Sequence, residues 1–400
     1  MALPGSGFRL VDCDGHILEP LDIWDRYVPR KYVDAANNAC SVYNDPDGGA
    51  RARINGELKT KGMQGGGTYG LSPEEGAKRR WLPGELADGG FYGKSRVADQ
   101  MDPQDIESVV IFGSLGNVLN GVRDGELLAE MCRGYNNWVS DEYCAPFPQR
   151  LYPMAYLPWQ NVPEARKELQ RTAEKGFKGI KVPAKRKLVE KPVYDPALDA
   201  VWGDAQDAGM TLAVHPSASF DGMPEMADVL TREAGALPAA GGIVSPLNGM
   251  VMLTYFIYGG ILDKYPKLKL AIIECNGGWM PLLLDRLDRQ YKMSPENFPG
   301  VKRLPSETFM QQCAVAFMAE ETTLPAFAEK YQDQIIWGTD FPHLDAENVA
   351  EIWETLEPVA EDIQAKILRN NAIRFFNLPL EPYGTPAAAA SSAGTAAMRS

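Results

Sequence analysis

The chain has 400 residues, of which 45% are hydrophobic and 23% charged, and its formal net charge is −13. This composition is typical of a globular protein with one large domain or two to three smaller ones. The acidic balance argues against nucleic acid and anionic membranes as partners, because both bind basic surfaces. The apolar stretch 249–262 is too short and too rich in glycine to span a bilayer, and it predicts a buried helix.

The cysteines and the N-terminus indicate the cellular compartment in which the protein is expected. Six cysteines are scattered along the chain without the close spacing of a metal or redox motif, so we expect reduced, buried thiols. The first residues lack a basic head followed by an apolar run, so no secretory leader is expected. Together these features predict a cytoplasmic protein.

Short apolar runs alternate with helix-like segments along most of the chain. Eight of the runs are predicted strands, at residues 8–14, 108–114, 150–158, 179–184, 211–217, 268–276, 312–320 and 334–340. The helix-like segments include residues 125–144, 162–176 and 196–209. Apolar strands separated by helices indicate a parallel sheet covered by helices. Eight such units predict an α/β protein with a closed (β/α)₈ TIM barrel. An open doubly wound sheet is the alternative, and no dinucleotide fingerprint follows the first strand.

Three segments do not fit a bare barrel. Residues 35–95 carry hairpin signals and are rich in Gly, Asn, Asp and Arg, which predicts an excursion with some β structure after the first strand. Residues 217–248 predict a second long loop. We expect one barrel domain over 8–380 and a tail over 381–400, of which 385–400 is low in complexity and expected to be disordered.

The three histidines of the chain all fall at the ends of predicted strands. His16 follows the first strand, His215 ends the fifth and His343 follows the eighth. Glu274 and Asp340 hold the same kind of position after the sixth and eighth strands. Because active sites of TIM barrels are built where the carboxyl ends of the strands meet, we expect these side chains to converge there.

The stretch "VDCDGHILEP" places Asp12, Asp14 and His16 at alternate positions, on one face of a strand. Burying unpaired carboxylates is costly, so either a cation compensates them or the face is exposed to solvent. Imidazole and carboxylate ligands together suit one divalent ion, with Zn²⁺ the first choice and Mn²⁺ or Fe²⁺ the alternatives. The predicted metal ligands are Asp14, His16, His215 and Asp340.

Several stretches resemble the amidohydrolase superfamily, in particular the amidohydrolase-2 branch that includes aminocarboxymuconate-semialdehyde and γ-resorcylate decarboxylases. "VDCDGHILEP", "AVHPS" and "WGTDFPH" resemble its ligand motifs on the first, fifth and eighth strands. Residues 134–158 and 253–288 resemble the segments before strand three and around strand six. The resemblance spans roughly residues 8–380 apart from the 35–95 insert. It implies a single-metal barrel, the ligand set named above and a homodimer or homotetramer.

This sequence departs from the decarboxylating relatives at the end of strand six, where many of them have a histidine and this chain has Glu274. A carboxylate there could act as acid–base, reach the metal or repel an anionic substrate. Lys181 holds the position of the carboxylated lysine of two-metal relatives, although the acidic first-strand motif argues for an ordinary ion pair instead. Glu19 either orients His16 or caps the helix that follows it.

Two reactions fit the same residues. In non-oxidative decarboxylation of a small aromatic or unsaturated acid, Asp340 or Glu274 would protonate the carbon that loses CO₂. In hydrolysis of an ester, lactone, amide or C–C bond, Asp340 would deprotonate a water molecule activated by the metal. His343 could shuttle a proton, bind substrate or brace its loop. The resemblance favours decarboxylation, Glu274 weakens that preference, and a non-catalytic metal-binding barrel is the alternative from another class.

Overall fold

Eight parallel strands form the centre of the protein. The computed structural model describes residues 7–45, 49–58, 66–184, 192–216, 240–319 and 321–384, with the side chains of 240–244 left aside. The strands pair in the order in which they are named, β1 (Leu10–Ile17), β5 (Ile106–Gly113), β6 (Leu151–Ala155), β7 (Gly179–Pro183), β8 (Thr211–His215), β9 (Leu270–Ile272), β10 (Cys313–Phe317) and β11 (Ile335–Trp337). The loop after β11 bonds to β1 and so brings the last strand beside the first, since Asp340 N donates to Asp14 O at 2.7 Å. All eight predicted strands and the TIM barrel are therefore confirmed.

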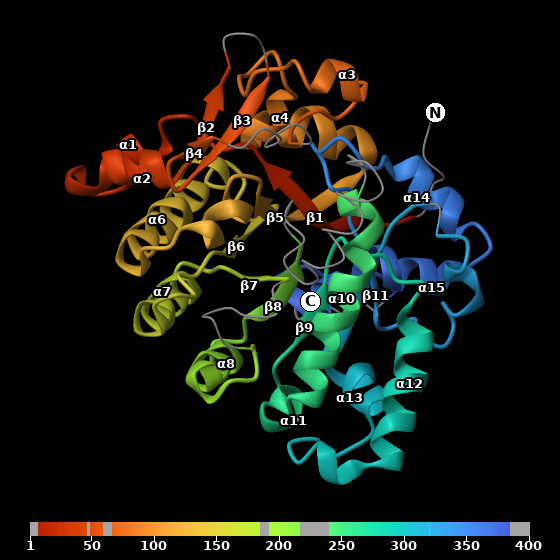
Figure 1. The fold of residues 1–400 in the computed structure, drawn as a ribbon. Coiled ribbons are helices and arrows are strands. Elements are labelled where there is room, and N and C mark those ends of the chain that lie inside the picture. Colours follow the sequence, from red (N-terminus) through yellow and green to blue (C-terminus); the bar gives the residue numbers. More distant parts are fainter. Residues whose placement is uncertain are drawn as a thin grey trace, which may run out of the picture.

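Helices surround this sheet, as Figure 1 shows. The larger ones are α6 (Gly125–Trp138), α7 (Val162–Glu174), α8 (Asp199–Asp207), α10 (Ala240–Tyr258), α12 (Met280–Met293), α13 (Pro305–Gln312), α14 (Val349–Leu356) and α16 (Asn371–Phe376). Helix α7 illustrates the pattern. The Asn161 side chain caps its N-terminus by accepting from Glu164 N, and one buried stripe faces the sheet.

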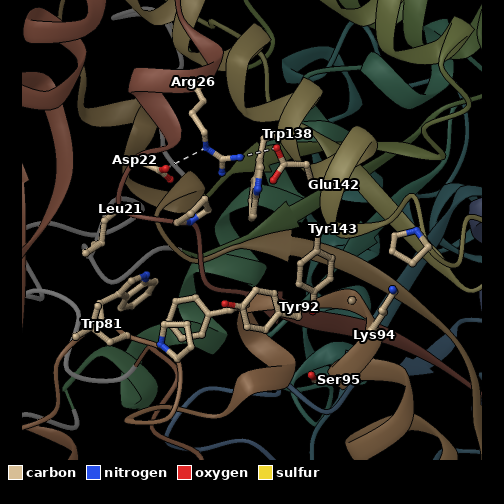
Figure 2. A pocket seen from close by; sticks show the side chains of 16 residues that line it. Leu21, Asp22, Arg26, Trp81, Tyr92, Lys94, Ser95, Trp138, Glu142 and Tyr143 are labelled. Carbon is tan, nitrogen blue, oxygen red and sulfur yellow. Dashed lines mark hydrogen bonds and ion pairs between the residues drawn. The ribbon is translucent and has the colours of Figure 1, made fainter.

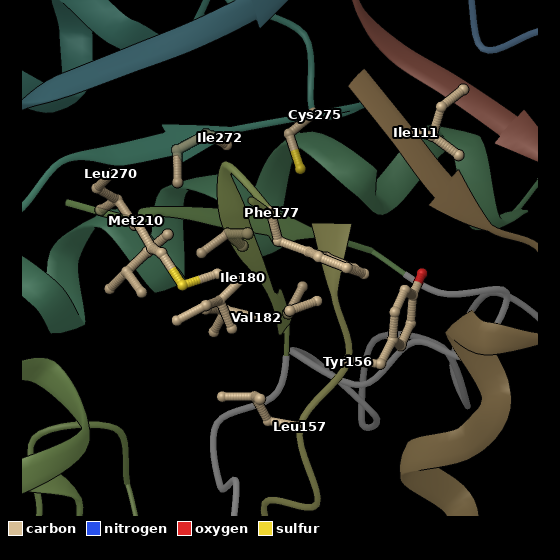
Figure 3. Packing of buried hydrophobic residues seen from close by; sticks show 14 of the residues in the cluster. Ile111, Tyr156, Leu157, Phe177, Ile180, Val182, Met210, Leu270, Ile272 and Cys275 are labelled. Atoms are coloured by element: carbon tan, nitrogen blue, oxygen red, sulfur yellow. The ribbon is translucent and has the colours of Figure 1, made fainter. Parts of the chain in front are cut away.

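Alternating strand residues build two apolar layers. Side chains such as Val11, Val110, Ala213 and Ile336 fill the barrel interior, and α16 closes its amino-terminal end. The residues between them point outward and pack against the helices. Figure 3 shows part of this outer layer, formed by Ile111, Tyr156, Leu157, Phe177, Ile180, Val182, Met210, Leu270, Ile272 and Cys275. With the interior filled and one end closed, the carboxyl ends of the strands are the place for a site.

The insert after β1 contains β structure, as predicted. Strands β2 (Cys40–Asn44), β3 (Ala50–Ile54) and β4 (Glu57–Leu58) form a separate antiparallel sheet outside the barrel (Figure 1). Asn55 and Gly56 connect β3 to β4 with φ of 49° and 83°, the backbone of a tight hairpin turn that Asn-Gly favours.

The predicted loop over 217–248 is partly wrong. Residues 217–239 lie outside the described residues, but α10 already begins at Ala240. Two glycines and Pro246 make this stretch a poor helix former, and packing overrides that local preference. The helix continues into the apolar segment, where Met252, Leu253 and Phe256 are buried. After α10, Gly260 takes a left-handed backbone with φ of 72°, and the short helix α11 (Ile261–Lys264) begins there.

Two further expectations concern cysteines and membranes. All six cysteines are free and buried, which confirms the predicted thiols. None of the helices in the described parts of the chain is long and apolar enough to cross a bilayer. Tyr383, near the start of the predicted tail, hydrogen-bonds through its backbone to Asn370, whereas residues 385–400 lie outside the described residues.

Candidate metal centre

Asp14 lies inside β1 as predicted, and His16 lies inside this strand as well rather than after it, because β1 extends to Ile17. Asp14 Oδ1 and His16 Nε2 are 3.4 Å apart, so these two side chains share a face. The pairing of β1 with β5 shifts register between Asp12 and Gly15, which turns Asp12 elsewhere. Only two of the three alternating polar residues therefore face the centre.

His215, the last residue of β8, brings its ring to the same place. Its Nδ1 lies 2.6 Å from Pro216 O, a contact that requires a proton on Nδ1 and leaves the Nε2 lone pair free. Nε2 lies 3.0 Å from His16 Nε2 and 3.2 Å from Asp14 Oδ1. The tautomer thus aims the metal-binding nitrogen at the other two candidate ligands.

Asp340 and Glu274 enter from the loops after β11 and β9. Asp340 Oδ1 lies 3.2 Å from His16 Nε2, and Glu274 Oε2 lies 3.4 Å from His215 Nε2. Both residues have a left-handed backbone, with φ of 54° and 52°, which is uncommon outside glycine and concentrates at functional sites.

Close approach of β1 and β11 makes this convergence possible. A Cβ added to Gly338 would lie 2.2 Å from Asp14 Cβ, so only glycine fits where the two ligand-bearing segments meet. The loop after β11 can therefore bring Asp340 against β1.

The spacing of the donor atoms fits one ion. Two donor atoms that each lie about 2.1 Å from an ion, at tetrahedral or octahedral angles, are about 3.0 to 3.4 Å apart. The shortest contacts among the donor atoms span 3.0 to 3.4 Å. The donor atoms of Asp14, His16 and His215 all lie within 4.8 Å of one another, whereas Asp340 forms a second such group with His16 and His343. Two imidazole nitrogens that face each other at 3.0 Å while both are buried are well explained by a shared cation. The residues present thus fit a divalent metal.

The protonation states of the residues at the centre also favour a bound divalent metal. Burial and the nearby His343 lower the pKa of His16, which favours the neutral ring that binds metals. Burial opposes ionisation of Asp14, but His215 and His16 outweigh it, and the pKa of Asp14 falls below its usual range. Burial raises the pKa of Asp340 well above its ordinary value, reinforced by Asp345 and Asp14. A cation would offset this crowding of carboxylates.

His343 lies beside this donor set and is held on three sides. Its Nδ1 is 2.9 Å from Asp340 Oδ1, its Nε2 is 2.9 Å from Ser114 Oγ, and its ring stacks on His16 with centroids 3.9 Å apart. The sequence did not reveal Ser114, because a lone serine after a strand carries no metal-ligand signal. Its position at the carboxyl end of β5 is the feature that could have drawn attention to it.

Asp12 supports the centre instead of lining it. Its carboxylate accepts hydrogen bonds from Asp14 N, Thr339 N and Thr339 Oγ1, which joins β1 to the loop after β11. Buried Arg96 lies 3.9 Å from this carboxylate and donates to the carbonyls of His16 and Phe341. Burial raises the pKa of Asp12 to about 6 despite Arg96. This network fixes the two segments that carry Asp14, His16 and Asp340.

Glu19 has neither of the roles expected for it. Its carboxylate accepts from Leu115 N at 2.8 Å and Gly116 N at 2.9 Å, and so holds the loop after β5. Lys181, on β7, is buried with its Nζ 5.9 Å from the centre of the Tyr156 ring.

A cavity of about 740 Å³ lies elsewhere on the surface. Figure 2 shows Arg26 between Asp22 and Glu142 at this cavity, with Trp81 and Tyr92 among its aromatic lining. None of the candidate ligands lines it, so we place the site at the strand ends and not in this cavity. Residues 217–239, which follow the β8 strand end and Pro216, are outside the described residues.

Comparison with known proteins places the chain in a family. Residues 11–378 match the family model described as Amidohydrolase. A γ-resorcylate decarboxylase from Rhizobium sp. (strain MTP-10005) is 25% identical over 288 residues, which are 70% of this chain and 85% of that protein.

Solved structures share the fold. An amidohydrolase from Mycobacterium avium subsp. paratuberculosis K-10 superposes with a TM-score of 0.77 at 22% identity, covering 94% of this chain and 98% of that one. A 5-carboxyvanillate decarboxylase from Novosphingobium aromaticivorans, complexed with manganese and 4-hydroxy-3-methoxy-5-nitrobenzoic acid, gives a TM-score of 0.65 at 19% identity, covering 94% and 97%. The family match confirms the resemblance seen in the sequence motifs, and this chain is an enzyme of the amidohydrolase family.

Proposed function

We propose that this protein is a metal-dependent decarboxylase that releases CO₂ from a hydroxylated aromatic acid without an oxidant. The observation that carries the proposal is the buried group of metal-binding atoms from Asp14, His16 and His215. Asp340 contacts His16 at 3.2 Å and Glu274 contacts His215 at 3.4 Å, so both carboxyl groups lie directly beside it. The γ-resorcylate decarboxylase from Rhizobium supports this reaction class, because its match covers 70% of this chain and 85% of that protein.

The residues of the chain divide the work between binding and proton transfer. A divalent ion in the donor set would supply positive charge for the carboxylate and neighbouring hydroxyl oxygen of the substrate. The reaction then needs a proton at the ring carbon that loses CO₂. The Glu274 side chain is 24% exposed and that of Asp340 only 3%, so Glu274 is the carboxyl group better placed to reach a substrate.

Glu274 is also suited to hold the proton before it is transferred. Burial, reinforced by Asp340 and Asp14, raises the pKa of Glu274 well above its ordinary value. A protonated Glu274 can donate to the ring carbon, and the proton released by the substrate acid group balances the reaction. Asp340 and His343, in contact at 2.9 Å, form a second proton-handling pair, and Asp340 offers an oxygen within 4.8 Å of one from Glu274.

Hydrolysis of an ester, lactone, amide or C–C bond is the second candidate function. The observation that favours it is the identity of Glu274, since many decarboxylating relatives have a histidine at this strand end. A second carboxylate beside the donor set disfavours an anionic substrate and suits a neutral carbonyl compound. In this reaction Asp340 would take the proton of the attacking water.

For the metal we propose Zn²⁺, because the donor set mixes two imidazole nitrogens with carboxylate oxygens. Mn²⁺ is the competing ion, and it is the one bound in the carboxyvanillate decarboxylase structure. We further propose a single barrel domain over residues 8–380 in a cytoplasmic homodimer or homotetramer. Light scattering of the purified protein tests the oligomeric state.

One assay distinguishes the two reactions. The metal-loaded protein is incubated with a panel of mono- and dihydroxybenzoic acids, including γ-resorcylate, and CO₂ release is followed in parallel with hydrolysis of aryl esters and lactones. CO₂ release that Glu274→Gln abolishes supports the decarboxylase. Hydrolysis without CO₂ release from any acid would replace it with the second candidate.

A further inference from the structure

Ser114, the first residue after β5, completes a chain of hydrogen bonds across the centre. Its Oγ lies 2.9 Å from His343 Nε2, and Nδ1 of the same ring lies 2.9 Å and 3.2 Å from the two carboxylate oxygens of Asp340. Ser114 and His343 are 229 positions apart in the sequence and meet because their strands end at the same face of the barrel.

The chemistry of the partners fixes the direction of each bond. A divalent ion bound at the centre would keep Asp340 ionised, and an ionised carboxylate can only accept, so His343 Nδ1 carries the proton in the metal-loaded protein. The neutral ring then accepts at Nε2, and the Ser114 hydroxyl donates to it. Ser114 Oγ contacts Nε2 at 2.9 Å, and Ser114 is buried, with 7% of the residue exposed.

The loop that carries Ser114 is itself held in place. Ser114 N donates to Ile17 O at 3.1 Å, and Gly113 N donates to the Tyr156 hydroxyl at 3.0 Å. The buried Glu19 carboxylate binds the next two amides, those of Leu115 and Gly116. A side chain anchored on both sides can hold its partner in one geometry.

The order serine–histidine–aspartate is also that of a hydrolytic triad, in which serine is a nucleophile. A nucleophilic serine needs free N–H donors to stabilise the oxyanion. Here both amides that follow Ser114 already donate to Glu19. The arrangement therefore favours a role in positioning over a role as nucleophile.

We propose that Ser114 is a positioning residue, whose hydroxyl holds the His343 ring in one orientation against Asp340. The expected effect on turnover rests on the decarboxylase proposed above, whereas the effect on the histidine ring does not. Losing a partner that orients a group at a metal site typically costs about 10- to 100-fold. We expect that loss in kcat, with KM changed by less than about threefold, because Ser114 acts through His343.

Nitrogen NMR of the zinc-loaded protein tests the positioning directly. The chain has three histidines, so labelling them with ¹⁵N gives a small set of ring signals, which His343→Gln assigns. The expected result is a single His343 tautomer with the proton on Nδ1 in the wild type. In Ser114→Ala we expect the Nε2 signal to shift and broaden, because this nitrogen loses its donor and the ring is no longer held in one orientation, with metal content unchanged.

Two further variants keep the test interpretable. Ser114→Thr retains the hydroxyl and is expected to restore the wild-type Nε2 signal. Ser108→Ala removes a buried serine from the start of the same strand, about 20 Å away, and is expected to leave both spectrum and kcat unchanged. A Ser114→Ala protein with the wild-type His343 spectrum would overturn the proposal. An inactive wild type that shows the expected spectra would instead reject only the proposed reaction.

Discussion

The Nε2 atoms of His16 and His215 face each other at 3.0 Å, although the residues are 199 positions apart. Because His215 Nδ1 already donates to Pro216 O, its Nε2 presents a lone pair. Burial also favours the neutral form of His16. Two buried nitrogens in this arrangement need a shared cation or a shared proton, and Asp14 and Asp340 surround them with carboxylates. This relationship is the basis of the metal-binding account.

The first prediction separates ligands from neighbours. His343→Asn is expected to keep about one equivalent of metal, because both ring nitrogens of His343 are engaged with Asp340 and Ser114. Metal analysis after dialysis against buffer without chelator measures this. Loss of the metal in His343→Asn would make His343 a ligand and would require a different centre.

The second prediction concerns the proton donor. Glu274→Gln preserves the shape of the side chain and removes its proton, so kcat for CO₂ release is expected to fall by about 100-fold or more. The metal should remain, because four other donors hold it. Initial rates on the best acid of the panel, normalised to metal content, provide the measurement. Unchanged kcat in Glu274→Gln would assign the proton to another group.

The third prediction tests the support of the centre. Arg96→Met leaves the Asp12 carboxylate buried without its cation, which is expected to lower the free energy of unfolding by about 3 to 5 kcal/mol. Arg166→Met breaks the exposed pair with Asp204 and is expected to cost far less, because solvent screens that pair. Urea unfolding of both variants makes the comparison. Equal losses of unfolding free energy in the two variants would show that the buried network stabilises the fold no more than an exposed ion pair does.

The fourth prediction is a dependence of stability on pH. Burial raises the pKa of Glu19 from an ordinary 4.5 to about 7, so the folded state holds this proton more tightly than the unfolded chain. The contribution of this proton to the free energy of unfolding is fully present below pH 4.5. It falls as the pH rises and is lost above about pH 7, a total loss of about 3 kcal/mol. The difference in free energy of unfolding between the wild type and Glu19→Gln should therefore decrease between pH 4.5 and 7.5.

Denaturant unfolding at several pH values gives that difference. Glutamine offers one carbonyl oxygen to the two amides of Leu115 and Gly116, so the variant has a constant deficit to which the pH-dependent part is added. Parallel stability curves for the two proteins between pH 4.5 and 7.5 would contradict the buried titration.

The barrel could be predicted from the sequence because its signals are local and repeated. Each strand is a short apolar run, and helices such as α7 begin at capping residues and keep one apolar stripe. The content of Ala, Gly and Met predicts a loop over 217–248, and the glycines and Pro246 of residues 240–248 do oppose a helix locally. The packing of α10 that overcomes this preference depends on residues distant in the sequence.

The site could be predicted only in part, for a similar reason. Polar groups at strand ends mark Asp14, His16 and His215, since strand ends converge in any barrel. The register shift that turns Asp12 toward Thr339, and the loops that bring Ser114 to His343, are properties of the folded chain. No local pattern encodes those contacts.

The most direct test of the account is the metal content of wild type and His215→Ala, measured by inductively coupled plasma mass spectrometry after reconstitution. We predict about one equivalent of a divalent metal in the wild type. This metal is lost in His215→Ala and retained in the matched variant His343→Asn. Circular dichroism confirms that both variants are folded. A wild type without metal after reconstitution, or a His215→Ala protein that keeps its full equivalent, would contradict the central claim.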